Sequence, residues 1–141
     1  MEQTERRQLV AQFWSIGQRF QKYLVVGAVG LAINQGLLMA LVSWLGLPVA
    51  FASPPAILVS VVVTFLLNER WTWHDRGAGK VVHRAMIYFA INGGGLLINW
   101  GILVWLHREG VPYQLANLVG AAVAAVSNFS LNNSITWREA R

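Results

Sequence analysis

The sequence predicts an all-α integral membrane protein with four transmembrane helices, and three observations support this. The 141-residue chain is 55% hydrophobic and 12% charged, and its mean hydropathy is +0.46. Long apolar stretches carry no charge, and two of them close with similar segments. A soluble globule of this size needs more polar surface, so lipid is the expected solvent.

Each apolar stretch is long enough to cross a bilayer, which takes about 20 residues for a hydrocarbon core of about 30 Å. Residues 24–67, 85–106 and 111–137 carry no charge, and Gly46–Pro48 divides the first stretch. We therefore expect spans at 23–45, 49–68, 85–106 and 114–135. The first stretch is too long and begins too late for a removable signal peptide, so all four spans should remain.

The segment before the first span has its own pattern. Apolar residues recur near helical spacing between polar ones at Leu9, Phe13, Trp14, Ile16 and Phe20. This pattern predicts a short amphipathic helix over 8–22, lying in the interface within a cytoplasmic segment 1–22. A frayed leader is the alternative.

The second span begins with Ser53-Pro54-Pro55. Proline is tolerated in the first turn of a helix, so a break or kink is expected there. A broken helix would line a cavity, whereas a kink would pack against neighbouring helices. The kink is the favoured interpretation.

Basic residues predict the topology. Ten of the eleven Lys and Arg residues precede the first span, separate the second from the third, or follow the fourth; Arg108 is the exception. The positive-inside rule therefore places both termini and the central loop in the cytoplasm, with residues 138–141 as a cytoplasmic tail. On this view Arg76 is an exposed anchor. The net charge of +5 is expected to reflect this topology and acidic lipids rather than nucleic acid.

The chain also repeats itself. Residues 65–73 recur at 129–137, and seven residues between Arg19 and Gly36 recur 65 positions later, between Arg84 and Gly101. The repeats cover about 19–73 and 84–137. With four spans they predict a parallel pair of two-helix units, as internal repeats build other membrane proteins.

Enzymatic chemistry has little support in the sequence. The chain has no cysteine, which excludes disulfides and thiolate sites, and all six acidic residues lie outside the spans. No carboxylate pair is evident for acid–base or metal catalysis, and His74-Asp75 is a weak metal motif. We expect a protein without enzymatic activity, metal or cofactor.

Polar residues inside the spans form stripes. They suggest a polar cavity, and interhelical hydrogen bonding is an equally good explanation. The residues are Asn34, Ser60, Thr64, Asn99 and Asn117.

The cytoplasmic ends of the spans suit a lipid phosphate. Arginine holds phosphate oxygens in a bidentate fork, an asparagine amide donates a hydrogen bond, and indoles occupy the interface. An ordinary aromatic belt with basic anchors is the alternative. The candidate phosphate ligands are Arg19, Asn68, Arg70, Arg84 and Asn132, and the candidate interface aromatics are Trp71, Trp73 and Trp137.

These residues give the chain a resemblance to the GtrA-like family of four-span membrane proteins. The matching features are Arg19-Phe20, Val26-Gly27, the Asn68…Trp71-Thr72-Trp73 motif, Arg84, and Asn128-Phe129 with Asn132, spread over 19–137. The resemblance adds Asn128 to the phosphate candidates. Two positions depart from the family pattern: Ala85 stands where Phe is usual, and Ser134 where a basic residue is common.

The resemblance implies a role with polyprenyl-phosphate-linked sugars in the bacterial cytoplasmic (inner) membrane. The expected function is translocation of such a lipid for cell-surface polysaccharide glycosylation, with a membrane glycosyltransferase and membrane lipids as partners. The alternative is a non-transporting anchor of that glycosyltransferase. Because four short spans enclose little space, a homodimer is also expected.

Overall fold

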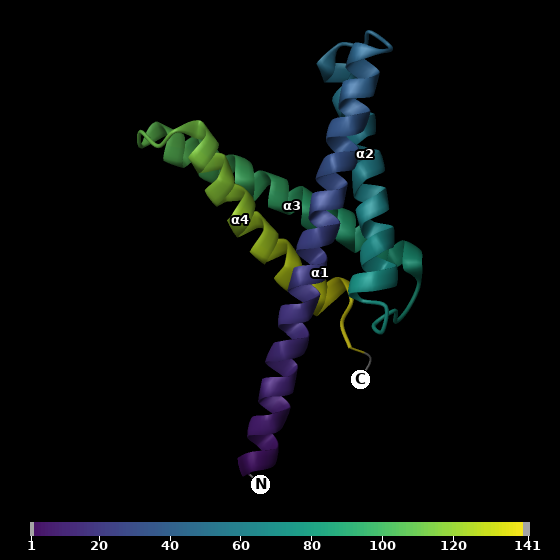
Figure 1. The fold of residues 1–141 in the computed structure, drawn as a ribbon, viewed down its shortest axis with the longest axis vertical. Helices are drawn as coiled ribbons and strands as arrows, with labels where there is room; N and C mark the ends of the chain where they lie inside the picture. Colours follow the sequence, from purple (N-terminus) through teal and green to yellow (C-terminus); the bar gives the residue numbers. More distant parts are fainter. Residues whose placement is uncertain (1, 140–141) are drawn as a thin grey trace. The chain divides into compact units, whose positions relative to one another are not determined.

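The computed structural model describes residues 2–139, apart from the side chains of residues 49, 113 and 114; the end of the expected 138–141 tail lies outside this range. Four α-helices fill most of it: α1 (Glu2–Ser43), α2 (Val49–Leu67), α3 (Val81–Arg108) and α4 (Tyr113–Leu131) (Figure 1). Short π-helices follow α2 and α4: η1 (Asn68–Thr72) and η2 (Asn132–Thr136). Within residues 2–139, four helical segments are long and apolar enough to span a membrane. The predicted multi-pass, all-α architecture is confirmed.

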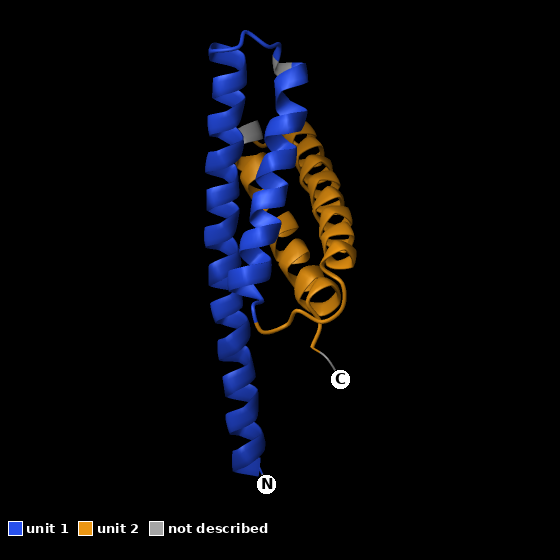
Figure 2. Ribbon diagram, turned by 90° about the vertical axis from the view of Figure 1, so that its right-hand side faces the viewer, with its two compact units in different colours: residues 1–74 blue, residues 75–141 orange. Residues whose placement is uncertain are grey.

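The chain divides into two compact units, residues 1–74 and residues 75–141 (Figure 2). In the first unit, α1 packs against α2 and η1. In the second unit, α3 packs against α4 and η2. Each unit is therefore a pair of helices whose second member ends in a π-helical turn.

The helix α1 is longer than expected. It runs unbroken from Glu2 to Ser43, a stretch of 42 residues, or about 63 Å at 1.5 Å per residue. The expected helix over 8–22 is thus its N-terminal part rather than a separate element, since no proline interrupts the sequence there. This part continues past the end of α2 (Figure 2).

The helix α2 is also continuous. It begins at Val49 and includes both Pro54 and Pro55. A proline has no N–H, so these two residues leave the carbonyls of Ala50 and Phe51 without their usual helical donor. A helix that begins only at Pro54, as in the broken-helix alternative, is not what the structure has.

Close approach of the two helices defines the packing of each unit. Ser60 Oγ donates a 2.7 Å hydrogen bond to the Gly30 carbonyl, and a Cβ at Gly30 would overlap the Thr64 methyl group. In the second unit a Cβ at Gly95 would overlap the Asn128 amide. Glycine therefore lets polar side chains of one helix reach the backbone of the other, as in many membrane helix pairs.

Candidate functional site

The π-helical turn of the first unit is closed by three residues of the repeated motif. The Trp73 amide donates a 2.9 Å hydrogen bond to the Asn68 carbonyl, and Thr72 Oγ1 donates a 2.8 Å hydrogen bond to Asn68 Oδ1. The Trp73 indole packs edge-on against the Tyr23 ring, with centroids 5.9 Å apart. We call Tyr23, Asn68, Thr72 and Trp73 the first clasp.

The second unit repeats this arrangement. The Trp137 amide donates to the Asn132 carbonyl at 2.9 Å, and Thr136 Oγ1 donates to Asn132 Oδ1 at 2.7 Å. The Tyr88 and Trp137 rings meet edge-on at 5.6 Å. These residues, Tyr88, Asn132, Thr136 and Trp137, are the second clasp.

Both clasps lie inside their units. Asn68 and Asn132 are 1% and 0% exposed, and Trp73 and Trp137 are both 0% exposed. A π-helical turn closes between residues five apart, so it brings the tryptophan onto the same side as the asparagine. An ordinary α-helical turn would rotate the indole away from the tyrosine. The π-turn thus allows the indole to be buried against the tyrosine.

This burial differs from the surface positions expected for four of the candidates. Asn68 and Asn132 were expected to donate to a lipid phosphate; each is buried and its Oδ1 accepts from a threonine hydroxyl of its own unit, and donation from their amide groups to a phosphate stays a prediction. Trp73 and Trp137 were expected in an interface belt, but they lie in the interior. The sequence alone does not predict the direction of the Trp73 and Trp137 side chains, because the helical hydrogen-bonding period changes just before them.

Two arginines hold backbone carbonyls near the clasps. Arg19 Nη1 donates to the Thr72 carbonyl at 3.5 Å. Arg84 is buried, and its Nη1 donates to the carbonyls of Ala78 and Gly79 at 2.6 and 2.9 Å. Both arginines therefore contribute to the local backbone structure, and their contact with a phosphate stays a prediction.

The first π-turn places a cation on its exposed side, next to the half-buried carboxylate of Glu69. Arg70 is exposed, and Trp71 is 43% exposed. Lys22 Nζ lies 5.7 Å from the Trp71 ring centroid, within the range of a cation–π interaction. We call Lys22, Arg70 and Trp71 the cationic turn.

The corresponding positions of the second unit are neutral. Ser134 and Ile135 stand where the first unit has Arg70 and Trp71, and both are exposed. An anion at the first turn can therefore contact a guanidinium group and an indole ring. At these two positions of the second turn it finds neither group. Of the expected interface aromatics, Trp71 alone has the exposed placement of a belt residue.

Arg76 is not the exposed anchor that the sequence predicts. Its Nη1 donates to Asn133 Oδ1 at 3.1 Å, and its Nη2 pairs with the Glu139 carboxylate. Only 13% of its side chain is exposed. Arg76 therefore joins the beginning of the second unit to its end. It is unsuitable as the exposed control for variants of a ligand site.

Four of the five expected polar cavity residues lie at helix contacts within single units. Ser60 and Thr64 pack at Gly30, as described above. In the second unit, Asn99 Nδ2 donates to Asn117 Oδ1 at 3.3 Å, and a Cβ at Gly120 would overlap Asn99. Among the described residues, buried amide oxygens without a hydrogen-bond partner occur at Asn34, Asn99 and Asn128. Ser60 and the Asn99–Asn117 pair hydrogen-bond between helices, as polar residues in membrane helices often do, whereas Thr64 Oγ1 donates to the Val61 carbonyl of its own helix.

Five residues of the site were not identified from the sequence, and two of them are Tyr23 and Tyr88, whose rings pack on the clasp tryptophans. Thr72 and Thr136 close the clasps, and Lys22 completes the cationic turn. The threonines had a usable signal, since both copies carry Thr-Trp directly after an Asn-x-x-x segment. Lys22 had none, because its relation to Trp71 depends on the packing of α1 against η1. Across the described residues, no group of three or more His, Asp or Glu side chains is arranged to hold a metal.

Comparison with known proteins gives two findings. Residues 22–137 match the family described as GtrA/DPMS, transmembrane domain. The chain is also 30% identical over 119 residues to a dolichol-phosphate mannosyltransferase of Pyrococcus furiosus. That similarity covers 84% of this chain but 34% of the relative, so the chain spans about one third of the relative's length.

Proposed function

Because the chain belongs to the GtrA/DPMS transmembrane-domain family, we propose that it binds a polyprenyl-phosphate-linked sugar and moves it across the membrane. The membrane proposed is the bacterial cytoplasmic membrane, and the process served is cell-surface polysaccharide glycosylation. The name of the Pyrococcus furiosus relative contains a prenyl-type lipid phosphate and a sugar, which supports this ligand class. The protein itself is proposed to have no enzymatic activity.

The cationic turn is the observation that carries the proposal. Lys22 and Arg70 supply two positive charges at the end of a membrane-spanning helix, and Trp71 supplies an aromatic face beside them. Arginine pairs with phosphate oxygens in a bidentate manner, and an indole covers the boundary between head group and acyl chain. The lipid phosphate is proposed to bind here, with its prenyl chain along the exposed surface of the spans.

The clasps are proposed to position this turn rather than to bind the ligand. In the first unit, the buried Asn68 and Trp73 fix the π-helical backbone that carries Arg70 and Trp71 between them. A ligand contact placed on a fixed turn loses less conformational entropy on binding than one on a mobile loop. Arg19, with its hydrogen bond to the Thr72 carbonyl, supports the same turn.

The experiment is reconstitution of the purified chain alone into vesicles with a labelled polyprenyl-phosphate sugar. Transfer of label between leaflets is measured by its accessibility to a membrane-impermeant reagent. We expect transfer that depends on the chain and falls in the Arg70→Gln variant. Lys80→Gln is the matched control, because Lys80 is an exposed cation in the other unit.

The alternative function is a non-transporting anchor for a membrane glycosyltransferase. The observation in its favour is that the matched region is about one third of a longer relative whose name is that of a transferase. Under this alternative, vesicles with the chain alone show no transfer between leaflets, and an effect appears only when a transferase is added. Transfer by the chain alone would rule the anchor out as the sole function.

A further inference from the structure

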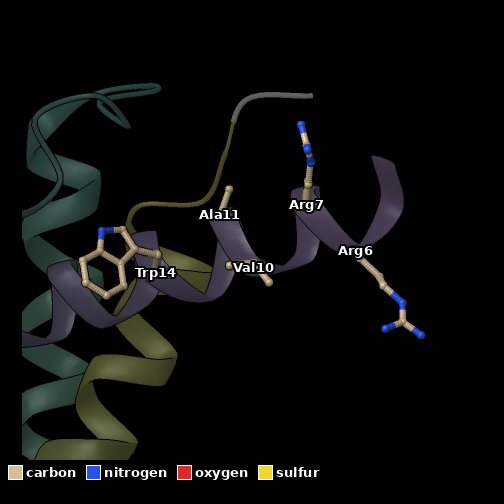
Figure 3. A pocket seen from close by; sticks show the side chains of 5 residues that line it. All are labelled: Arg6, Arg7, Val10, Ala11 and Trp14. Carbon is tan, nitrogen blue, oxygen red and sulfur yellow. The ribbon is translucent and has the colours of Figure 1, made fainter. Parts of the chain in front are cut away.

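The N-terminal part of α1 exposes an unusually apolar surface. Leu9, Val10, Phe13 and Trp14 are 53%, 68%, 73% and 71% exposed. A shallow pocket on this surface is lined by Arg6, Arg7, Val10, Ala11 and Trp14 (Figure 3). An apolar surface of this kind, bordered by basic residues, marks a contact with a membrane or a protein.

This surface extends beyond the expected hydrocarbon layer if α1 stays straight. The charge-free stretch starts just after Lys22, and Leu9 lies 13 residues before it, or about 20 Å along a helix. The head-group layer on each side of a bilayer is about 5–8 Å thick. A straight, upright helix would therefore hold its large apolar side chains in water.

The apolar surface continues the exposed apolar side of the span. Leu24 and Leu31 lie 14 and 21 residues after Val10. Two helical turns take about seven residues, so all three side chains lie on nearly the same side of α1. Leu24 and Leu31 are 46% and 61% exposed. The side of the helix that meets acyl chains in the span is thus the side that is apolar in the extension.

Charge favours the same contact. Residues 2–22 hold four basic and two acidic side chains, a net charge of +2. Arg6 and Arg7 border the apolar surface at the pocket (Figure 3). Basic residues beside Trp and Phe are typical of helices that lie at the surface of acidic membranes.

We infer that residues 2–14 form a membrane-surface helix that lies on the leaflet adjoining the N-terminal end of the first span. Leu9, Val10, Phe13 and Trp14 insert at the boundary between head groups and acyl chains, and Arg6 and Arg7 contact acidic head groups. The structure has α1 continuous here, and the inferred change of direction at the membrane surface is placed at Ser15–Gly17 because kinks concentrate at Ser and Gly. This inference is independent of the proposed transport.

Single spin labels test this contact in the full-length protein. The chain has no cysteine, so Val10→Cys and Gln12→Cys each give one labelled site, on sides of the helix about 160° apart. In vesicles of neutral and acidic phospholipid, the label at position 10 should be accessible to oxygen and protected from a nickel chelate. The label at position 12, the matched control, should be accessible to the chelate.

Two results would overturn the inference. Equal chelate accessibility at both positions would mean that the helix projects into water. Protection of position 10 from both reagents, with dipolar broadening between labels, would mean that a second copy covers the surface.

Charge variants give a second measurement on the labelled protein. A basic residue near an acidic surface contributes about 1 kcal/mol, or about fivefold in partitioning. Arg6→Gln and Arg7→Gln should each lower the ratio of inserted to exposed label about fivefold in acidic vesicles. Glu5→Gln should raise that ratio, and an unchanged ratio in all three variants would count against contact with acidic head groups.

Discussion

The two units share their interior and differ on their exposed turns. In each unit an asparagine, a threonine, a tryptophan and a tyrosine form the same clasp, with hydrogen bonds of nearly equal length. On the exposed side of the turn, the first unit has Arg70 and Trp71 where the second has Ser134 and Ile135. The shared residues therefore identify what the fold needs, and the differing residues identify where the units can have different functions.

The arginines near the clasps differ in a related way. Arg19 reaches the last residue of its own π-turn, whereas Arg84 reaches the loop that precedes its helix. The loop of the second unit is further fastened by Arg76 to Asn133 and Glu139. The second turn is thus tied to the loop before α3 through the Asn133 side chain, whereas the first turn keeps Arg70 exposed.

The largest expected effect concerns topology, on which the duplicated arrangement depends. Ten of eleven basic residues lie on one predicted side, so reporters fused after Arg76 and at the C-terminus should both read cytoplasmic. A tag inserted after Glu109 should read external. A C-terminal reporter outside the cytoplasm would show that the two units do not cross the membrane in the same direction.

The next largest effect is expected on stability when a clasp tryptophan is removed, and the loss should be similar in both units. Trp73→Ala and Trp137→Ala each leave a large cavity at a fully buried site, and such truncations cost about 3 kcal/mol or more. Unfolding of the reconstituted protein followed by circular dichroism should show similar losses for both. Trp71→Ala, at a side chain 43% exposed, is the matched control and should cost far less. A large loss in one unit alone would contradict the structural equivalence of the clasps.

Affinity for the lipid phosphate is expected to differ between the two turns, although the stability losses are expected to be similar. Arg70→Ser gives the first turn the residue that the second has, and loss of a charge-assisted contact of about 1.5–3 kcal/mol lowers affinity roughly ten- to a hundredfold. Ser134→Thr, at the equivalent exposed position, should leave affinity unchanged. Binding of a fluorescent polyprenyl phosphate to the protein in nanodiscs measures both. Equal affinities of the two variants would show that the lipid phosphate does not bind at the cationic turn.

The helices could be predicted from the sequence because their physical cause is local. Charge-free stretches of spanning length fixed the number of helices, and short segments rich in Gly and Pro indicated where they end. Continuity of α1 was not predicted, because the change from amphipathic to fully apolar composition near Lys22 resembles a boundary between two elements. Helical hydrogen bonding continues through such a change when no proline intervenes.

The site was predicted in composition but not in orientation. Repetition drew attention to Asn68 and Asn132, and their basic and aromatic neighbours indicated a surface role. The π-helical turn brings Trp73 and Trp137 onto the buried side that already carries these asparagines, and a single extra residue in a helical turn is hard to recognise in a sequence. The exposed Arg70 was identified, whereas Lys22 was not, since it belongs to another helix.

The smallest expected effect comes from the threonine hydroxyls. Thr72→Val and Thr136→Val keep the side-chain shape but remove the donor to Asn68 Oδ1 or Asn132 Oδ1. A typical hydrogen bond contributes about 1 kcal/mol, and an acceptor left unpaired in the interior adds to the loss. We expect each variant to lower the unfolding free energy by about 1–2 kcal/mol, with Thr72→Ser and Thr136→Ser as controls that keep the hydroxyl. If the clasp of the first unit also fixes the cationic turn, Thr72→Val weakens lipid-phosphate binding while Thr136→Val does not. Equal binding by the two valine variants would separate the clasp from the ligand and leave it a purely structural element of both units.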